Sequence, residues 1–148
     1  TQRGSIGHSH VLGPELRSFE GARSVLCKLL AKAAMRLRHE QFLAGGMAIR
    51  IRFVGMDARF EQDLRFAPID DTPALLRMLG DKLERMRRAI AAGRWDPKRN
   101  PPLSVAVTLV GLSPRVAVCG ELMAERRRAH AISALRSRVS GQFGPSAW

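Results

Sequence analysis

Arginine side chains recur at even spacings in one stretch of this chain, between residues 47 and 66. Arg50 and Arg52 lie in its first half, and Arg59 and Arg65 lie in its second half. The planar guanidinium group binds phosphate oxygens through two parallel hydrogen bonds, so it suits anionic backbones. Even spacing on strands places all four groups on one face. We therefore predict that this face binds a polyanion, of which a nucleic-acid backbone is the most abundant.

A second interpretation of these arginines is a solvated sheet face that is held together by ion pairs. Glu61 and Asp63 alternate with Arg59 and Arg65, and opposite charges on neighbouring strands pair readily. The overall charge favours binding. The 148-residue chain carries 25 Lys and Arg against 13 Asp and Glu, a net charge of +12. This balance is typical of a chain whose partner is DNA, RNA or an acidic membrane surface.

Two histidines, His8 and His10, are the only other pair whose spacing suggests chemistry. Residues two apart on a strand face the same side, where two imidazoles can bind a metal or move protons. A metal site needs a third ligand, and none is placed at a suitable spacing among His39, His130, Cys27 and Cys119. Ile6 and Leu12 share the histidine face, which favours packed side chains over a small hydrolase. We predict no catalytic residue, no metal site and no cofactor in this chain.

The sequence predicts both strands and helices, which together position these residues. Alternation of apolar and polar residues predicts strands at 5–12 and 103–110 and a hairpin at 47–66. Apolar residues at three- and four-residue steps predict helices at about 15–41 and 72–92. Gly45 and Gly46 are expected to end the first helix. Thr72 is expected to cap the second helix, with Pro73 at its first position.

The order strand, helix, strand, strand, helix, strand indicates an α+β fold. Two helices with one apolar stripe each are best accommodated on one face of a four-stranded sheet. The other face stays open, and the strand order is left undetermined. The residues predicted on this open, DNA-binding face are Ser5, Gly7, Ser9, Arg50, Arg52, Arg59, Arg65, Ser104 and Thr108.

The chain divides into a short linker (residues 1–4), this domain (residues 5–114) and a basic tail (residues 115–148). The tail is predicted to be partly helical over 121–140, and its Arg126 to Arg128 run either follows a phosphate strand or is a solvated helix face. We find no apolar run of the roughly 20 residues that a membrane span needs. Because no signal peptide is visible either, a cytoplasmic, nucleoid-associated location is expected. The chain begins at Thr1 without an initiator Met, as a piece of a longer protein would.

Five phrases in order carry a resemblance to a known family: SIGHSHVL, KAAMRLR, IRIRF, FAPIDDTPALLRML and VAVTLVGLSP. Together, over residues 4–114, they resemble the C-terminal little finger domain of Y-family translesion DNA polymerases of the DinB and UmuC type. The resemblance implies a non-catalytic, monomeric domain that grips template-primer DNA during damage bypass. It also implies that Ser5, Ile6 and Gly7 contact the template backbone.

The resemblance further implies that the parent chain is a DNA polymerase whose magnesium-binding palm lies upstream. Relatives often carry a sliding-clamp peptide with a Gln at its start. Here residues 119–123 keep only the hydrophobic pair Leu122 and Met123, which weakens the case for a clamp as partner.

The alternative function is an RNA-binding or ribosome-associated domain with a basic open sheet. Trp95, in a basic loop, could stack on a base or could pin the loop to the core. The chain contains no Tyr, and aromatic residues make up only 5% of it. An aromatic stacking platform of the RNA-binding kind is therefore poorly supported.

Overall fold

Four long strands form one antiparallel sheet in this computed structural model, which describes residues 4–116. The sheet order is β1-β4-β2-β3, and the strands are β1 (Ser5–Val11), β2 (Phe42–Phe53), β3 (Phe60–Ile69) and β4 (Pro102–Val110). A two-residue strand, β5 (Ser113–Pro114), pairs with the start of β2. The last long strand of the chain thus lies between the first two, a non-local pairing that the sequence pattern left open.

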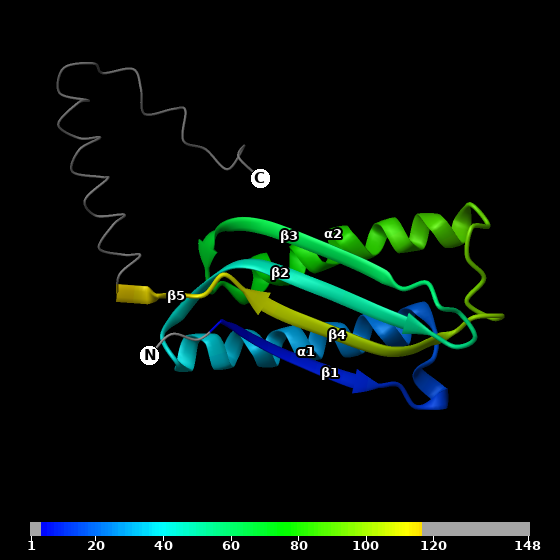
Figure 1. The fold of residues 1–148 in the computed structure, drawn as a ribbon, viewed down its shortest axis with the longest axis horizontal. Helices are drawn as coiled ribbons and strands as arrows, with labels where there is room; N and C mark the ends of the chain where they lie inside the picture. Colours follow the sequence, from blue (N-terminus) through cyan, green and yellow to red (C-terminus); the bar gives the residue numbers. More distant parts are fainter. Residues whose placement is uncertain (1–3, 117–148) are drawn as a thin grey trace, which may run out of the picture.

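Two helices, α1 (Phe19–His39) and α2 (Thr72–Ala91), lie on one side of this sheet (Figure 1). Helix α1 packs against β1 and β4, and α2 packs beside α1 toward the β3 edge. The predicted α+β architecture, with two helices on one face of a four-stranded sheet, is confirmed. The opposite face carries no described helix.

The core between sheet and helices contains only apolar side chains among the described residues. The largest members that are fully buried are Ile6, Leu12, Leu26, Leu30, Leu37, Met47, Ile49, Ile51, Leu75, Leu79, Leu83 and Leu109. Burial of each such side chain contributes about 1.5–3 kcal/mol. The alternation along the strands places these residues inward, so the intervening residues must face the open side.

Helix α1 is shorter than the predicted range of 15–41. It begins at Phe19, because the Oγ of Ser18 accepts a hydrogen bond from the Gly21 amide at 3.0 Å and caps the helix. Residues Pro14–Leu16 form a separate 3-10 turn, η1. The helix ends at His39, and Gln41 then adopts a positive φ of 61°.

The prediction that Gly45 and Gly46 end this helix is wrong, because both lie inside β2. A Cβ atom at Gly46 would lie 2.8 Å from the backbone oxygen of Leu64 and 2.9 Å from a methyl group of Val110. The pairing of β2 with β3 also shifts register between Ala44 and Gly46. These glycines therefore allow close strand contact at a bulge.

Helix α2 has its predicted extent but a different cap. Asp71, not Thr72, is the N-cap residue, and its carboxylate accepts a hydrogen bond from the Ala74 amide at 3.0 Å. The Thr72 hydroxyl instead accepts one from Arg38 of α1 at 2.5 Å. The acidic residue fits the positive end of the helix dipole better than a hydroxyl does.

The chain leaves the domain beside the start of β2. The Arg115 amide donates to the Gln41 carbonyl at 2.8 Å, and the Arg115 guanidinium pairs with Asp70. The predicted tail helix at 121–140, Arg126 to Arg128 and the segment 119–123 lie outside the described residues. Within residues 4–116, no helix is both long enough and apolar enough to span a membrane.

Candidate nucleic-acid interface

The strand register brings eight of the nine predicted residues onto the open face of the sheet. Gly7 pairs with Thr108, and Arg52 pairs with Ser104. Arg50 lies opposite Ala106 on one side and Glu61 on the other. Neighbouring rows on this face are Ser5–Val110–Gly46–Arg65, Gly7–Thr108–Ala48–Asp63 and Ser9–Ala106–Arg50–Glu61. The face therefore has a region of small side chains over β1 and β4 and a charged region over β2 and β3.

Arg59 is the exception, since β3 begins one residue later at Phe60. Arg59 belongs to the exposed loop between β2 and β3, not to the sheet. The prediction of four sheet arginines is wrong for this residue. Arg59 fits the alternation pattern in the sequence, but the pairing of β3 with β2 begins only at Phe60, so the pattern extends one residue beyond the strand.

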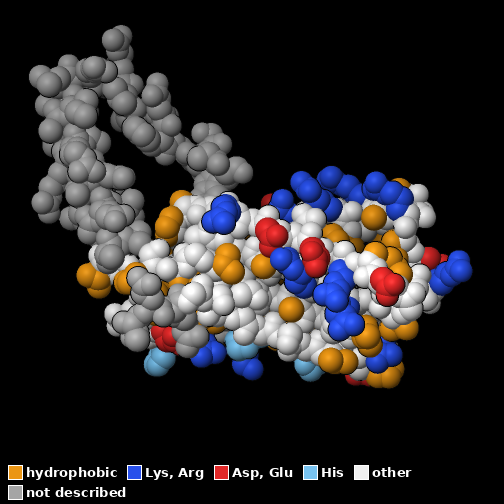
Figure 2. All heavy atoms as spheres, in the orientation of Figure 1, with side chains coloured by type: hydrophobic (Ala, Val, Ile, Leu, Met, Phe, Trp, Pro, Cys, Tyr) orange, Lys and Arg blue, Asp and Glu red, His pale blue; other side chains and the backbone are white. Residues whose placement is uncertain are grey.

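Over β1 and β4 the open face consists mostly of uncharged polar side chains and backbone, drawn white in Figure 2. Ser5, Gly7 and Ser9 are exposed, while Ser104 and Thr108 are partly exposed. At Gly7 the face is tight, because a Cβ there would lie 2.6 Å from the Thr108 hydroxyl oxygen. An approaching ligand therefore meets backbone and hydroxyl groups over this half of the sheet, together with the exposed side chain of Val11 and the partly exposed side chain of Val110.

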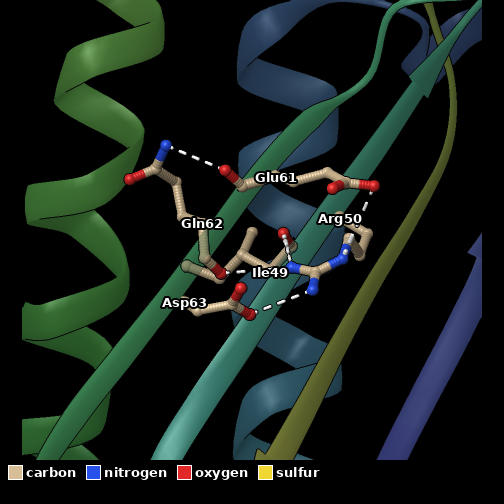
Figure 3. Close-up of polar contacts among 5 residues, drawn as sticks. All are labelled: Ile49, Arg50, Glu61, Gln62 and Asp63. Carbon is tan, nitrogen blue, oxygen red and sulfur yellow. Dashed lines mark hydrogen bonds and ion pairs between the residues drawn. The ribbon is translucent and has the colours of Figure 1, made fainter.

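Arg50 is held by β3 (Figure 3). Its Nη2 lies 3.0 Å from an Asp63 carboxylate oxygen, and its Nε lies 3.8 Å from a Glu61 oxygen. Its Nη1 also donates to the carbonyls of Ile49 at 2.9 Å and Gln62 at 3.3 Å. The cross-strand ion pairs that the sequence offered as an alternative are therefore present at this residue. Arg50 adds little free positive charge to the face.

Arg52 differs from Arg50 in both exposure and partners. It is exposed, and within residues 4–116 it makes no ion pair and no side-chain hydrogen bond. Arg65, in the middle of β3 and in register with Gly46, is likewise exposed. Within residues 4–116, Arg52 and Arg65 are therefore the sheet arginines whose guanidinium groups are available to an external anion, whereas Arg50 is paired.

Trp95 pins the loop between α2 and β4 to the core. Its ring centroid lies 4.5 Å from that of Phe53 in a tilted arrangement, and its Nε1 donates to the Asn100 carbonyl at 3.0 Å. These contacts support the interpretation that Trp95 holds the loop against the core, and they do not support base stacking by Trp95. The open face over the four-strand ladder carries no aromatic residue, since Phe60 and Phe66 pack toward the core.

The two histidines do not form a site. His8 is half-buried and His10 is exposed. Burial lowers the pKa of His8 below its ordinary value of 6.5, and the positive charges of Lys32 and Arg36 on α1 add to this effect. Among the described residues no group of three His, Cys, Asp or Glu could hold a metal. Two surface grooves, of 1130 and 760 Å³, are not lined by either histidine.

Lys32 and Arg36 were treated from sequence only as residues off the apolar stripe of the first helix. Their effect on His8 shows that they lie near the β1 edge of the sheet. Their spacing of four residues, shared with Lys28, is the signal that could have marked them as a basic stripe.

Comparison with protein families identifies a match that covers most of the chain. The C-terminal domain of the impB/mucB/samB family matches residues 3–115. A search of curated proteins found no match.

Solved structures share the fold at low sequence identity. A Y-family DNA polymerase chimera of Dbh and Dpo4 is 15% identical, with a TM-score of 0.58 over 77% of this chain and 30% of the matched chain. An insertion ternary complex of Dbh DNA polymerase is 14% identical, with a TM-score of 0.57 over 74% of this chain and 29% of the matched chain. A complex of the β-clamp processivity factor and the little finger domain of PolIV gives 12% identity and a TM-score of 0.52, over 74% of this chain and 90% of the matched chain.

Proposed function

Because this chain belongs to the family of impB/mucB/samB C-terminal domains and is a Y-family polymerase little finger domain, we propose that it grips template-primer DNA by phosphate contacts. The chain spans only about a third of the polymerases that it matches, 30% of the chimera and 29% of Dbh. Nucleotide transfer, its magnesium ions and damage bypass are proposed for the parent protein, in a cytoplasmic, nucleoid-associated setting.

The observation that carries the proposal is the register of the open face. Both described helices lie behind the sheet, so the rows from Ser5 to Arg65 face outward. Hydroxyl groups and backbone lie on one half of this face, and Arg52 lies beside them in register with Ser104. A duplex backbone can approach that half closely while the guanidinium group contacts a phosphate.

The outer edge of β1, which pairs with no described strand, supports the same orientation. The Leu12 amide donates to the Leu103 carbonyl of the β4 side at 2.8 Å. Hydrogen-bond direction alternates along an antiparallel ladder, so the amides of Gly7 and Ser9 point away from β4. Backbone amides at an edge are frequent phosphate ligands. The contacts expected from them carry no base sequence, so binding should be nearly independent of sequence.

Fluorescence anisotropy with a labelled primer-template tests the proposal across several salt concentrations. The Arg52→Ala variant should lower the slope of log K against log salt by about 0.9, the value for one phosphate contact. Arg85→Ala, which removes an exposed arginine from α2 behind the sheet, is the matched control. If both variants bind with the same slope, the open face is not the DNA surface.

A competition experiment with structured RNA distinguishes DNA binding from the alternative function, an RNA-binding domain. The absence of aromatic side chains on the described open face disfavours recognition of unstacked bases. Primer-template DNA should therefore displace labelled DNA at lower concentration than a hairpin RNA does. The reverse order would favour an RNA-binding domain.

A sliding clamp is a further candidate partner of the parent protein. A structural neighbour contains the β-clamp together with the little finger domain of PolIV. In this chain the segment 119–123 lacks the Gln expected at the start of a clamp peptide. Size-exclusion chromatography of the 148-residue chain mixed with a bacterial clamp tests this partner. If the two proteins elute separately, the clamp is not a partner of this chain.

A further inference from the structure

Helix α1 carries a basic stripe on its exposed surface: Lys28, Lys32 and Arg36 follow one another at four-residue steps. Arg36 pairs with Glu40 at 2.9 Å. Lys28 and Lys32 make no ion pair with any carboxylate of residues 4–116. The stripe therefore presents two cations whose charge the described part of the chain does not offset.

This arrangement opposes the stability of the helix. Like charges four residues apart repel each other, and the stripe contains two such steps. An ordinary solvated helix alternates charge signs along its surface, as Glu84 and Arg87 do on α2, where they lie 3.5 Å apart. A same-sign run is compensated when an external anion binds it.

The stripe lies next to the outer edge of β1. Helix α1 packs beneath β1 and β4, and the charges of Lys32 and Arg36 act on the His8 side chain of β1. Figure 2 shows basic and histidine side chains close together along the lower edge of the molecule, where Figure 1 places β1 and α1. From the open face, a path over the outward amides of Gly7 and Ser9 leads around this edge to the stripe.

The charge balance of the two surfaces differs. Over β2 and β3, Glu61 and Asp63 offset Arg50 and leave Arg52 and Arg65 as the exposed cations of the sheet. Among the carboxylates of residues 4–116, only Glu40 pairs with a cation of the α1 stripe. The edge beyond β1 is therefore at least as attractive to a polyanion as the predicted sheet face.

We propose that the phosphate contacts of bound DNA continue around the outer edge of β1 onto α1, where Lys28, Lys32 and Arg36 bind the backbone of the same duplex. This inference rests on the proposed function, because it needs DNA on the open face. The three cations are separated by eight residue steps in all, which span about 12 Å of helix. One strand of duplex DNA presents about three or four phosphates over this length.

The test compares two double variants with the same change in charge. Lys28→Ala with Lys32→Ala removes the unpaired cations of the stripe, and Arg85→Ala with Arg88→Ala removes two exposed arginines of α2. Alanine keeps the helix propensity in both. For duplex DNA, the stripe variant should lose about 1.8 in salt slope. The affinity ratio of parent to stripe variant then falls about twelvefold from 50 to 200 mM salt, whereas the α2 variant should keep the parent slope.

Each outcome decides one question. If the stripe variant behaves like the α2 variant while Arg52→Ala loses slope, DNA lies on the open face and the extension onto α1 is wrong. If Arg52→Ala also keeps the parent slope, the proposed function itself fails. The NMR titration of His8 gives a second measurement. Phosphates on the stripe offset the field of Lys32 and Arg36, so bound DNA should raise the pKa of His8, and an unchanged titration would overturn the extension.

Discussion

The Arg50 guanidinium lies 3.0 Å from the Asp63 carboxylate across the β2–β3 pair. This ion pair, with the longer contact to Glu61, occupies one of the arginines that the sequence predicts on the binding face. Both side chains remain partly open to water, so the pair adds little to stability. Its main consequence is electrostatic, because it lowers the positive potential over the β2–β3 half of the open face.

We expect that Asp63→Asn tightens DNA binding. The substitution removes one negative charge from the face and the shorter of the two ion pairs of Arg50, which makes this guanidinium group more available to a phosphate. The salt slope should steepen by up to about 0.9, the value of one added contact. Anisotropy titrations of the variant and the parent measure this slope. Asp81→Asn, which removes an exposed charge from α2, is the control, and equal slopes for the two variants would contradict the expectation.

We expect that Asp71→Ala lowers the free energy of unfolding by about 1 kcal/mol, because it removes the cap of α2. Thr72→Ala should cost less, since its hydroxyl only accepts an exposed hydrogen bond from Arg38. Urea unfolding followed by circular dichroism gives both values. A larger loss for Thr72→Ala than for Asp71→Ala would show that the cap has been assigned to the wrong residue.

Much of the fold could be predicted because each strand shows its inward face by alternation. Met47, Ile49 and Ile51 are fully buried, and the residues between them face the open side, as the pattern indicates. The strand order could not be predicted in this way. Placing β4 between β1 and β2 depends on contacts between residues far apart in sequence, which local periodicity does not contain.

The candidate site was predicted in its composition but not in its electrostatics. Eight residues reach the open face because the side-chain period of a strand is two. Whether Arg50 is paired depends on the strand register. This register places Glu61 opposite Arg50, and Asp63 two residues further along β3 on the same face. Similarly, Gly45 and Gly46 have the composition of a helix end, and only the close approach of Leu64 and Val110 shows why β2 needs the second glycine.

We expect that Gly7→Ala destabilises the domain by about 1–3 kcal/mol, the usual cost of overpacking. The new methyl group would lie 2.6 Å from the Thr108 hydroxyl oxygen and 3.1 Å from its methyl group. In a Thr108→Ala background the same substitution should cost less, which a double-mutant cycle measures.

Gly80→Ala in α2 is the control for this cycle. No atom lies within 4 Å of the position of its new Cβ. Alanine should therefore stabilise the helix by about 0.5–1 kcal/mol. Additive costs at Gly7 and Thr108 would show that the two residues are not in steric contact.

We expect that His8 makes the stability of the domain depend on pH. Its Nε2 is buried without a hydrogen-bond partner among the described residues, and burial with the charges of Lys32 and Arg36 lowers its pKa. Val107 of β4, its neighbour in the ladder, is apolar and offers no compensating charge. The lowered pKa favours the neutral imidazole in the folded state. The stability that this contributes is present above the unfolded value of 6.5 and is lost as the pH falls through the folded pKa.

Urea unfolding at several pH values between 8 and 5 measures this loss, with His8→Gln as the control that cannot titrate. The difference in unfolding free energy between the parent and His8→Gln should decrease as the pH falls below 6.5. Other groups affect both proteins alike, so the difference isolates His8. Lys32→Ala should weaken the effect, because it removes one of the charges that lower the pKa. Parallel pH curves for the parent and His8→Gln would mean that the imidazole titrates equally in the folded and unfolded chains.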